Sequence, residues 1–218
     1  MRILKQAEQF PQRHAVMGAP GEPDKTQYKH WPGLRDTISS IGGRWRDEPV
    51  TLGDGSKTNV YLDLKSVLSN GHRMNQAAHA MREHAQNLGL DYNAIGGPTM
   101  GADMLSHTMT SHNPDLNWFS VRDKPKTTHG LGKWVEGAEI GPDHKVIITD
   151  DVANTGKSLV DAYHKVRETG AQVSAIMPIV DRGDKTRNQF KALGVPYHPL
   201  MSYEDLGINT LSNPGGQP

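Results

Sequence analysis

The chain has 218 residues, with 24 lysines and arginines, 24 aspartates and glutamates, and no cysteine. This length suits one medium domain with its own core, and the balanced charge gives no general attraction to nucleic acid or to an acidic membrane. The lack of cysteine excludes disulfides, and no apolar run approaches the roughly 18 residues that span a bilayer. The first residues lack the apolar core of a signal peptide, so we expect a soluble, cytoplasmic protein.

The N-terminal part of the chain differs in character from the rest. Its first 45 residues are polar and rich in proline, with one short helix expected near residues 2–9. Proline favours irregular connections over continued helix or strand. We predict a small N-terminal hood at 1–45, a main domain at 46–210 and a disordered tail at 211–218.

Between hood and tail, predicted strands alternate with predicted helices. Apolar runs indicate strands near 60–64 and at 92–97, 117–122, 145–149, 172–180 and 196–201, and apolar residues at helical spacing indicate helices over 71–88, 102–112 and 157–169. The basic, glycine-rich segment 123–133 is predicted to be a loop. The alternation predicts an α/β fold with a central, mainly parallel sheet flanked by helices. Such sheets bind ligands at the carboxyl ends of their strands, where 96–103, 150–158 and 181–185 would lie.

The stretch VIITDDVANTGKS, residues 146–158, carries the most specific pattern. Its end is similar to an ATP-binding phosphate loop, but that loop needs a glycine where Asp151 stands, so we reject this interpretation. Backbone N–H groups at the start of the following helix could instead cradle a phosphate, beside the hydroxyls of Thr155 and Ser158. Asp150 and Asp151 could accept hydrogen bonds from sugar hydroxyls or meet a hydrated Mg²⁺. A ribose flanked by a phosphate fits this layout.

The stretch resembles the phosphoribosyl-pyrophosphate (PRPP) motif of type I phosphoribosyltransferases, in which two acidic residues follow a strand and a small-residue loop ends in Thr-Gly-x-Ser. Other segments along the chain resemble the orotate phosphoribosyltransferase family in the same order. They are LGDGSKTNVYLDLKSVL (52–68), AIGGPTMGADML (94–105), SVRDKPKTTHGLGKWVEG (120–137) and IVDRGDK (179–185). The resemblance covers roughly residues 48–208. It implies the type I phosphoribosyltransferase fold and the transfer of phosphoribosyl from PRPP to orotate, giving orotidine 5′-monophosphate and pyrophosphate.

The resemblance also implies roles for individual residues. Asp150 and Asp151 would act on the ribose, with Mg²⁺ held near them mainly by PRPP and water. Orotate would contact Asn154, Arg182 and the chain near Tyr61, with the arginine binding the carboxylate that uracil and the purines lack. The catalytic set would be Lys126, Arg122, His129, Asp150 and Asp151. The PRPP-binding set would be Arg122, Lys124, Lys126, His129, Asp150, Asp151, Val152, Ala153, Asn154, Thr155, Gly156, Lys157, Ser158, Thr99 and Gly101.

The cationic segment 122–132 resembles a mobile catalytic loop. Its positive charges would stabilise the departing pyrophosphate, and its closure would keep water from the reacting ribose. In the resembling family this loop reaches the neighbouring subunit's site, which implies a homodimer.

Two other functions are also compatible with the sequence. Gly53 stands where many orotate-specific members have a base-contacting lysine, and Asp123 stands where a second basic residue is usual. The alternatives are a phosphoribosyltransferase for another nucleobase and a non-catalytic PRPP-binding regulator. The histidines of the helix at 71–88, His84 among them, are expected on its polar surface.

Overall fold

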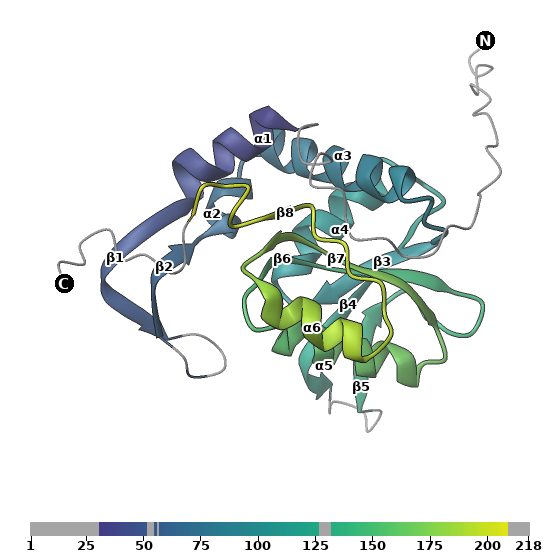
Figure 1. Ribbon diagram of the computed structural model, residues 1–218. Helices are drawn as coiled ribbons and strands as arrows, with labels where there is room; N and C mark the ends of the chain where they lie inside the picture. Colours follow the sequence, from purple (N-terminus) through teal and green to yellow (C-terminus); the bar gives the residue numbers. More distant parts are fainter. Residues whose placement is uncertain (1–30, 52–54, 56, 127–131, 209–218) are drawn as a thin grey trace, which may run out of the picture.

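The computed structural model describes residues 31–51, 55, 57–126 and 132–208 (Figure 1). The predicted helix near 2–9, the tail at 211–218, Gly53 and His129 lie outside these ranges. The predicted main domain is described over most of its length, and its strands and helices alternate along the chain.

A six-stranded sheet forms the centre of the fold, in the order β5-β4-β3-β6-β7-β8. Neighbouring strands are parallel except for β4 and β5, which form an antiparallel hairpin. The central, mainly parallel sheet predicted from the sequence is therefore confirmed. The strands are β3 (Ala94–Pro98), β4 (Asn117–Lys126), β5 (Lys133–Gly137), β6 (Lys145–Ala153), β7 (Gln172–Asp181) and β8 (Met201–Ser202).

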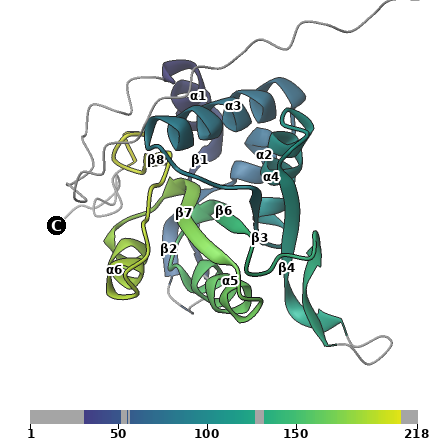
Figure 2. The ribbon, with the colours of Figure 1, turned by 90° about the vertical axis from the view of Figure 1, so that its right-hand side faces the viewer.

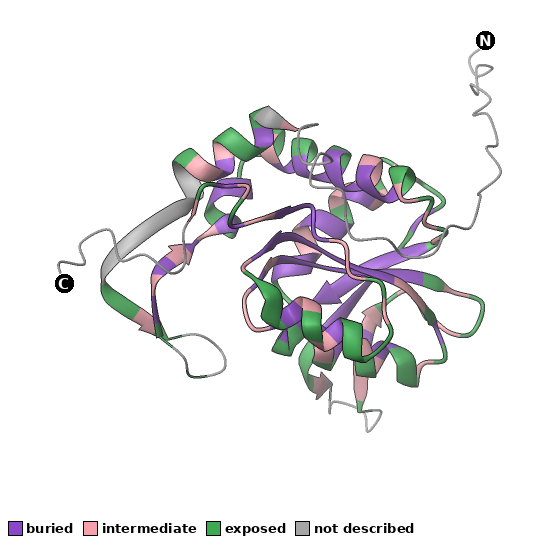
Figure 3. Cartoon of the chain, in the orientation of Figure 1, coloured by how far each residue is buried: buried purple, intermediate pink, exposed green. Residues whose placement is uncertain are grey.

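Helices cover both faces of the sheet (Figure 1). One face carries α3 (Gly71–Asn87) and α4 (Gly101–Ser111), and the other carries α5 (Lys157–Glu168) and α6 (Asp184–Ala192). Side chains of β6 alternate between the two cores, so that Ile147 packs on the α3 side and Ile148 on the α5 side. Because both faces are covered, the first apolar residues of this strand are fully buried (Figure 3).

Two strands continue beyond their predicted ends. Strand β6 includes Asp150 and Asp151, which were predicted to follow it, because its pairing with β7 continues as far as Asp181. Strand β4 includes Lys124 and Lys126, which were predicted to lie in a loop, because β5 pairs alongside it. Helix α6 was not predicted at all, and the last strand shrinks to the two residues of β8.

Residues 32–68 form a layer beside the sheet. It contains α1 (Pro32–Thr37), the π-helix η2 (Ile38–Gly42), β1 (Gly43–Thr51), β2 (Lys57–Leu62) and α2 (Leu64–Leu68). Strands β1 and β2 pair as an antiparallel ribbon that extends away from the central sheet in Figure 1. Strand β1 crosses the predicted boundary between hood and main domain, so the ribbon and α1 form one continuous structure.

His84 is buried, contrary to the prediction that it lies on the helix surface. It is 4% exposed, and its ring meets that of Trp31 edge-on at 5.9 Å. Trp31, directly before α1, packs on this side of α3, where its Nε1 also donates a hydrogen bond of 3.0 Å to Glu83. Burial, helped by the charge of His198, lowers the pKa of His84 to about 4.

Candidate active site

Three polar segments meet at one edge of the sheet. They follow β3, β6 and β7, which are parallel neighbours and therefore end on the same side. The Arg182 N–H, just after β7, donates to the carbonyl of Ala153 at the end of β6, at 3.0 Å. Gly101, just after β3, lies against the carboxylates of β6. The sequence-based prediction that these segments come together is confirmed.

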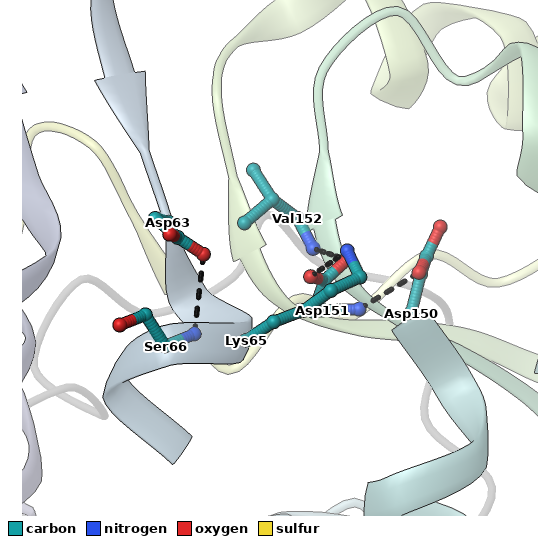
Figure 4. A network of polar contacts seen from close by, with 6 residues as sticks. All are labelled: Asp63, Lys65, Ser66, Asp150, Asp151 and Val152. Carbon is teal, nitrogen blue, oxygen red and sulfur yellow. Dashed lines mark hydrogen bonds and ion pairs between the residues drawn. The ribbon is translucent and has the colours of Figure 1, made fainter. Parts of the chain in front are cut away.

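Asp150 and Asp151, called the acidic pair below, lie buried at the end of β6. They are 9% and 7% exposed. Oδ1 of Asp150 accepts the N–H of Asp151 at 2.9 Å, and Oδ1 of Asp151 accepts the N–H of Val152 at 2.9 Å (Figure 4). These bonds fix the orientation of both carboxylates. Burial, followed by the charge of Asp151, raises the pKa of Asp150 well above its usual range.

Lys65 is a site residue that sequence reasoning missed. Its Nζ lies 2.5 Å from Oδ2 of Asp151 (Figure 4). Burial disfavours the ammonium form, but the hydrogen bond and charge of Asp151 outweigh it and the pKa of Lys65 is raised. The only sequence signal is its place in the segment 52–68, two residues after the helix-capping Asp63. Its partner is 86 residues away, so the pattern alone could not reveal the pair.

The loop after β3 brings main chain against the acidic pair. A Cβ on Gly101 would collide with carboxylate oxygens of both aspartates, and one on Gly97 would collide with the carbonyl of Thr149. Only glycine permits such close approach. The Thr99 hydroxyl, by contrast, hydrogen-bonds Ser120 on β4 at 2.8 Å. Backbone, rather than the Thr99 side chain, therefore faces the acidic pair here.

A bend at 154–156 connects β6 to the start of α5. Gly156 has φ of +78°, and a Cβ there would collide with a side chain of α6, so the turn requires glycine. Thr155 is half-buried and Ser158 is exposed beside the first turn. The N–H groups of a helix's first turn lack partners within the helix and can bind an anion. The side chain of Lys157 instead pairs with Asp161 along the helix at 2.6 Å.

Among the described side chains of the β4–β5 hairpin, the structure does not bring Arg122 or Lys124 to the acidic pair. Nη1 of Arg122 lies 3.6 Å from Oε1 of Glu136 on β5, and Lys124 is exposed. Within the described ranges, no hydrogen bond or ion pair joins either cation to the acidic pair. Lys126 is described only as the last residue of β4, and His129 lies outside the described residues.

Arg182 connects the end of β7 to the ribbon. Its Nη2 donates to the Thr58 hydroxyl at 2.5 Å, and its guanidinium lies 5.9 Å from the ring centre of Tyr203. Its Nη1 is buried and has no hydrogen-bond partner in the part of the chain that is described. A buried donor left unsatisfied is costly, and a carboxylate is its strongest partner. Thr58 thus holds Arg182 in place, while Nη1 of Arg182 has no hydrogen-bond partner among the described residues.

Aromatic side chains complete the surroundings of Arg182. Tyr203 is 3% exposed. This burial is the main cause that raises the pKa of Tyr203 to about 12, against the charge of Arg182, which lowers it. Tyr61 was predicted for the base site, whereas Thr58 and Tyr203 were missed. Asn154 is half-buried at the start of the neighbouring bend.

The α/β sheet carries an acidic pair, a helix start and a glycine loop on adjacent strand ends. This is the architecture of the type I phosphoribosyltransferases. A solved structure of Mycobacterium tuberculosis orotate phosphoribosyltransferase in complex with PRPP matches the fold with a TM-score of 0.65 and 26% identity. The match covers 83% of this chain and 98% of that chain.

Sequence relatives show which family of phosphoribosyltransferases the chain belongs to. Orotate phosphoribosyltransferase of Pyrococcus abyssi is 34% identical over 155 residues, 71% of this chain and 84% of the relative. That of Corynebacterium glutamicum is 32% identical over 161 residues, 73% of this chain and 85% of the relative. No family model matches the sequence. The chain belongs to the orotate phosphoribosyltransferase family.

Proposed function

We propose that this chain transfers the phosphoribosyl group of PRPP to orotate, forming orotidine 5′-monophosphate and pyrophosphate in pyrimidine biosynthesis. Membership of the family supports the reaction. The observation that carries the choice of base is the buried, unsatisfied Nη1 of Arg182. Orotate has a ring carboxylate that can fill this place, and a guanidinium binds a carboxylate through two parallel hydrogen bonds.

The remaining site residues suit the other parts of the reaction. The acidic pair would accept hydrogen bonds from the ribose hydroxyls, and the N–H groups of 154–158 would hold the 5′-phosphate. The main chain at 99–101 would contact the pyrophosphate. In the transition state the ribose becomes more positive and the pyrophosphate more negative. Carboxylates fixed beside the ribose and N–H groups fixed beside the pyrophosphate would therefore stabilise the transition state more than they stabilise the bound substrates.

Mg²⁺ fits this site as an ion that the substrate carries. Across the described residues, no group of three or more acidic or histidine side chains is arranged to hold a metal. The acidic pair offers only two carboxylates, and Mg²⁺ prefers six oxygen ligands, several from water and phosphate. Bound to PRPP, the ion would neutralise negative charge on the departing pyrophosphate.

The β4–β5 hairpin is proposed to serve the site of a neighbouring subunit in a homodimer. It carries Arg122, Lys124, Lys126 and His129, the cations assigned to the pyrophosphate. Figure 2 shows it projecting beyond the sheet. Support comes from the lack of described contacts between Arg122 or Lys124 and the acidic pair of the same chain.

The family's metabolic role supports a cytoplasmic location for this activity. Among the described residues, no helix has the length and apolar character needed to cross a membrane.

The first experiment follows orotate absorbance with PRPP and Mg²⁺, with uracil, hypoxanthine and adenine as parallel substrates. We expect consumption of orotate alone, and its loss in Arg182→Ala. Turnover of another base that survives Arg182→Ala would instead identify a phosphoribosyltransferase of different specificity. PRPP binding without turnover of any base would identify a regulator.

A further inference from the structure

Lys65 binds the outer oxygen of the Asp151 carboxylate. Asp151 Oδ1 accepts the N–H of Val152 at 2.9 Å, and its Oδ2 lies 2.5 Å from Lys65 Nζ (Figure 4). Both oxygens of this carboxylate are thus engaged by the chain itself. A ribose hydroxyl or a hydrated cation reaches Oδ2 only by sharing it with the ammonium or by displacing it.

The backbone of Lys65 is held in place by the packing of α2, while its ammonium group can move. Its neighbours Leu64, Val67 and Leu68 are at most 2% exposed, and Asp63 caps α2 by accepting the N–H of Ser66 at 3.1 Å. The side chain of Lys65 is 47% exposed. A lysine has a flexible four-carbon stem, so the ammonium can leave Asp151 without any movement of α2.

The ammonium balances charge that would otherwise be costly. Two adjacent carboxylates, both less than a tenth exposed, repel each other and are partly cut off from water. Across the described ranges, the ion pair with Lys65 is the only one that the acidic pair makes. A divalent cation is attracted by the same two carboxylates, so it must compete with Lys65 for them.

We propose that Lys65 is a built-in counterion that keeps free divalent cations off the acidic pair and gives up its place when PRPP arrives with its metal. The identity of the incoming ligand rests on the proposed function, whereas the competition between Lys65 and a cation concerns this chain alone. The metal then enters the site together with the substrate, rather than before it.

The test measures Mn²⁺ binding to the free full-length protein by electron paramagnetic resonance, without PRPP or orotate. Lys65→Met keeps most of the stem and removes the charge, and Lys65→Arg keeps the charge. We expect Lys65→Met to bind Mn²⁺ about two- to fivefold more tightly than wild type, the change that loss of one partly exposed ion pair produces. Lys65→Arg should bind like wild type, and adding Asp151→Asn to Lys65→Met should abolish the gain.

Lys145 supplies a matched control. It pairs with Asp91 at the same 2.5 Å, and its side chain is 48% exposed, but it lies away from the acidic pair. Lys145→Met should leave Mn²⁺ binding unchanged. Equal Mn²⁺ affinity in wild type and folded Lys65→Met would overturn the proposal.

A second measurement covers the case in which Lys65→Met does not fold. In the wild-type protein, the ¹⁵N signal of the Lys65 ammonium should be detectable while the ion pair protects it. It should disappear when PRPP and Mg²⁺ are added, and its persistence would equally reject the counterion role. Neither measurement uses turnover, so failure of this proposal is distinct from failure of the proposed reaction.

Discussion

At the scale of single residues, the proposed recognition of the base would depend on how firmly Arg182 is held. The Thr58 hydroxyl accepts its Nη2 N–H at 2.5 Å and also accepts the N–H of Val60 at 3.1 Å, within its own strand. Thr58 is 8% exposed, so water cannot easily replace it. In the proposed function, the threonine would therefore be a positioning residue that holds Arg182 against the ribbon.

Replacing Thr58 by valine tests this role, because valine keeps the shape and removes the hydroxyl. A hydrogen bond to a charged group contributes about 1.5–3 kcal/mol, so we expect the KM for orotate to rise by roughly tenfold or more. The KM for PRPP should change little. Steady-state kinetics with each substrate varied in turn measure both constants.

Two further variants separate positioning from simple destabilisation. Thr58→Ser keeps the hydroxyl and should restore most of the orotate affinity. Thr108→Val removes a half-buried hydroxyl on α4, away from Arg182, and should change neither KM. Equal increases in both KM values for Thr58→Val would argue against a specific role toward the base.

At the scale of elements, the burial of His84 on α3, beside Trp31, gives the fold a dependence on pH. The folded chain keeps His84 neutral down to a pKa of about 4, whereas the unfolded chain binds a proton near the ordinary value of about 6.5. Between these values the unfolded state binds more protons, so stability falls as pH falls. Above pH 6.5 the stabilising contribution of neutral His84 is complete.

We therefore expect the free energy of unfolding to fall between pH 7 and pH 4.5, with up to about 2 kcal/mol of the fall due to His84. Urea unfolding of wild type and His84→Leu at both pH values measures this part, since leucine fills the site without titrating. His72→Gln, an exposed change on the same helix, should keep the wild-type dependence. An unchanged slope in His84→Leu would show that other groups cause the fall.

The elements that could be predicted from the sequence are those with a local signal. Apolar residues at helical spacing mark α3 and α5, because one face of each helix is buried. An unbroken apolar run marks β6, because both faces of this strand are buried. Helix α6 buries only Thr186 and Phe190, so its apolar residues are too few to show a period. The predicted ends of β4 and β6 were wrong because pairing with the neighbouring strand, rather than residue composition, decides where a strand ends.

The same difference between local and distant signals separates the predicted from the missed site residues. The acidic pair and Gly156 belong to one continuous motif, which the structure places at the end of β6 and in the bend that follows it. Lys65 and Thr58 reach their partners across 86 and 124 residues, respectively. Such contacts exist only once the ribbon and α2 have packed against the strand ends, so no pattern along the chain indicates them.

At the scale of the whole molecule, the question is whether one chain forms a complete site. The cations of the β4–β5 hairpin and the acidic pair would belong to different subunits if the hairpin acts across a homodimer. Lys126→Ala should then lower turnover by about 10²–10³, the effect of losing one group that stabilises developing negative charge. Asp151→Asn should also lower turnover, by weakening contacts to the ribose.

Mixing these two inactive variants distinguishes a shared site from a self-contained one. In a mixed dimer, one site combines both changes, while the other receives an intact hairpin from the Asp151→Asn chain and an intact acidic pair from the Lys126→Ala chain. Random exchange of subunits should therefore restore about a quarter of wild-type activity, because half of the dimers are mixed and each has one intact site. The measurement is turnover before and after co-refolding, with exchange verified by differently tagged chains. If verified mixed dimers stay inactive, each hairpin serves its own chain.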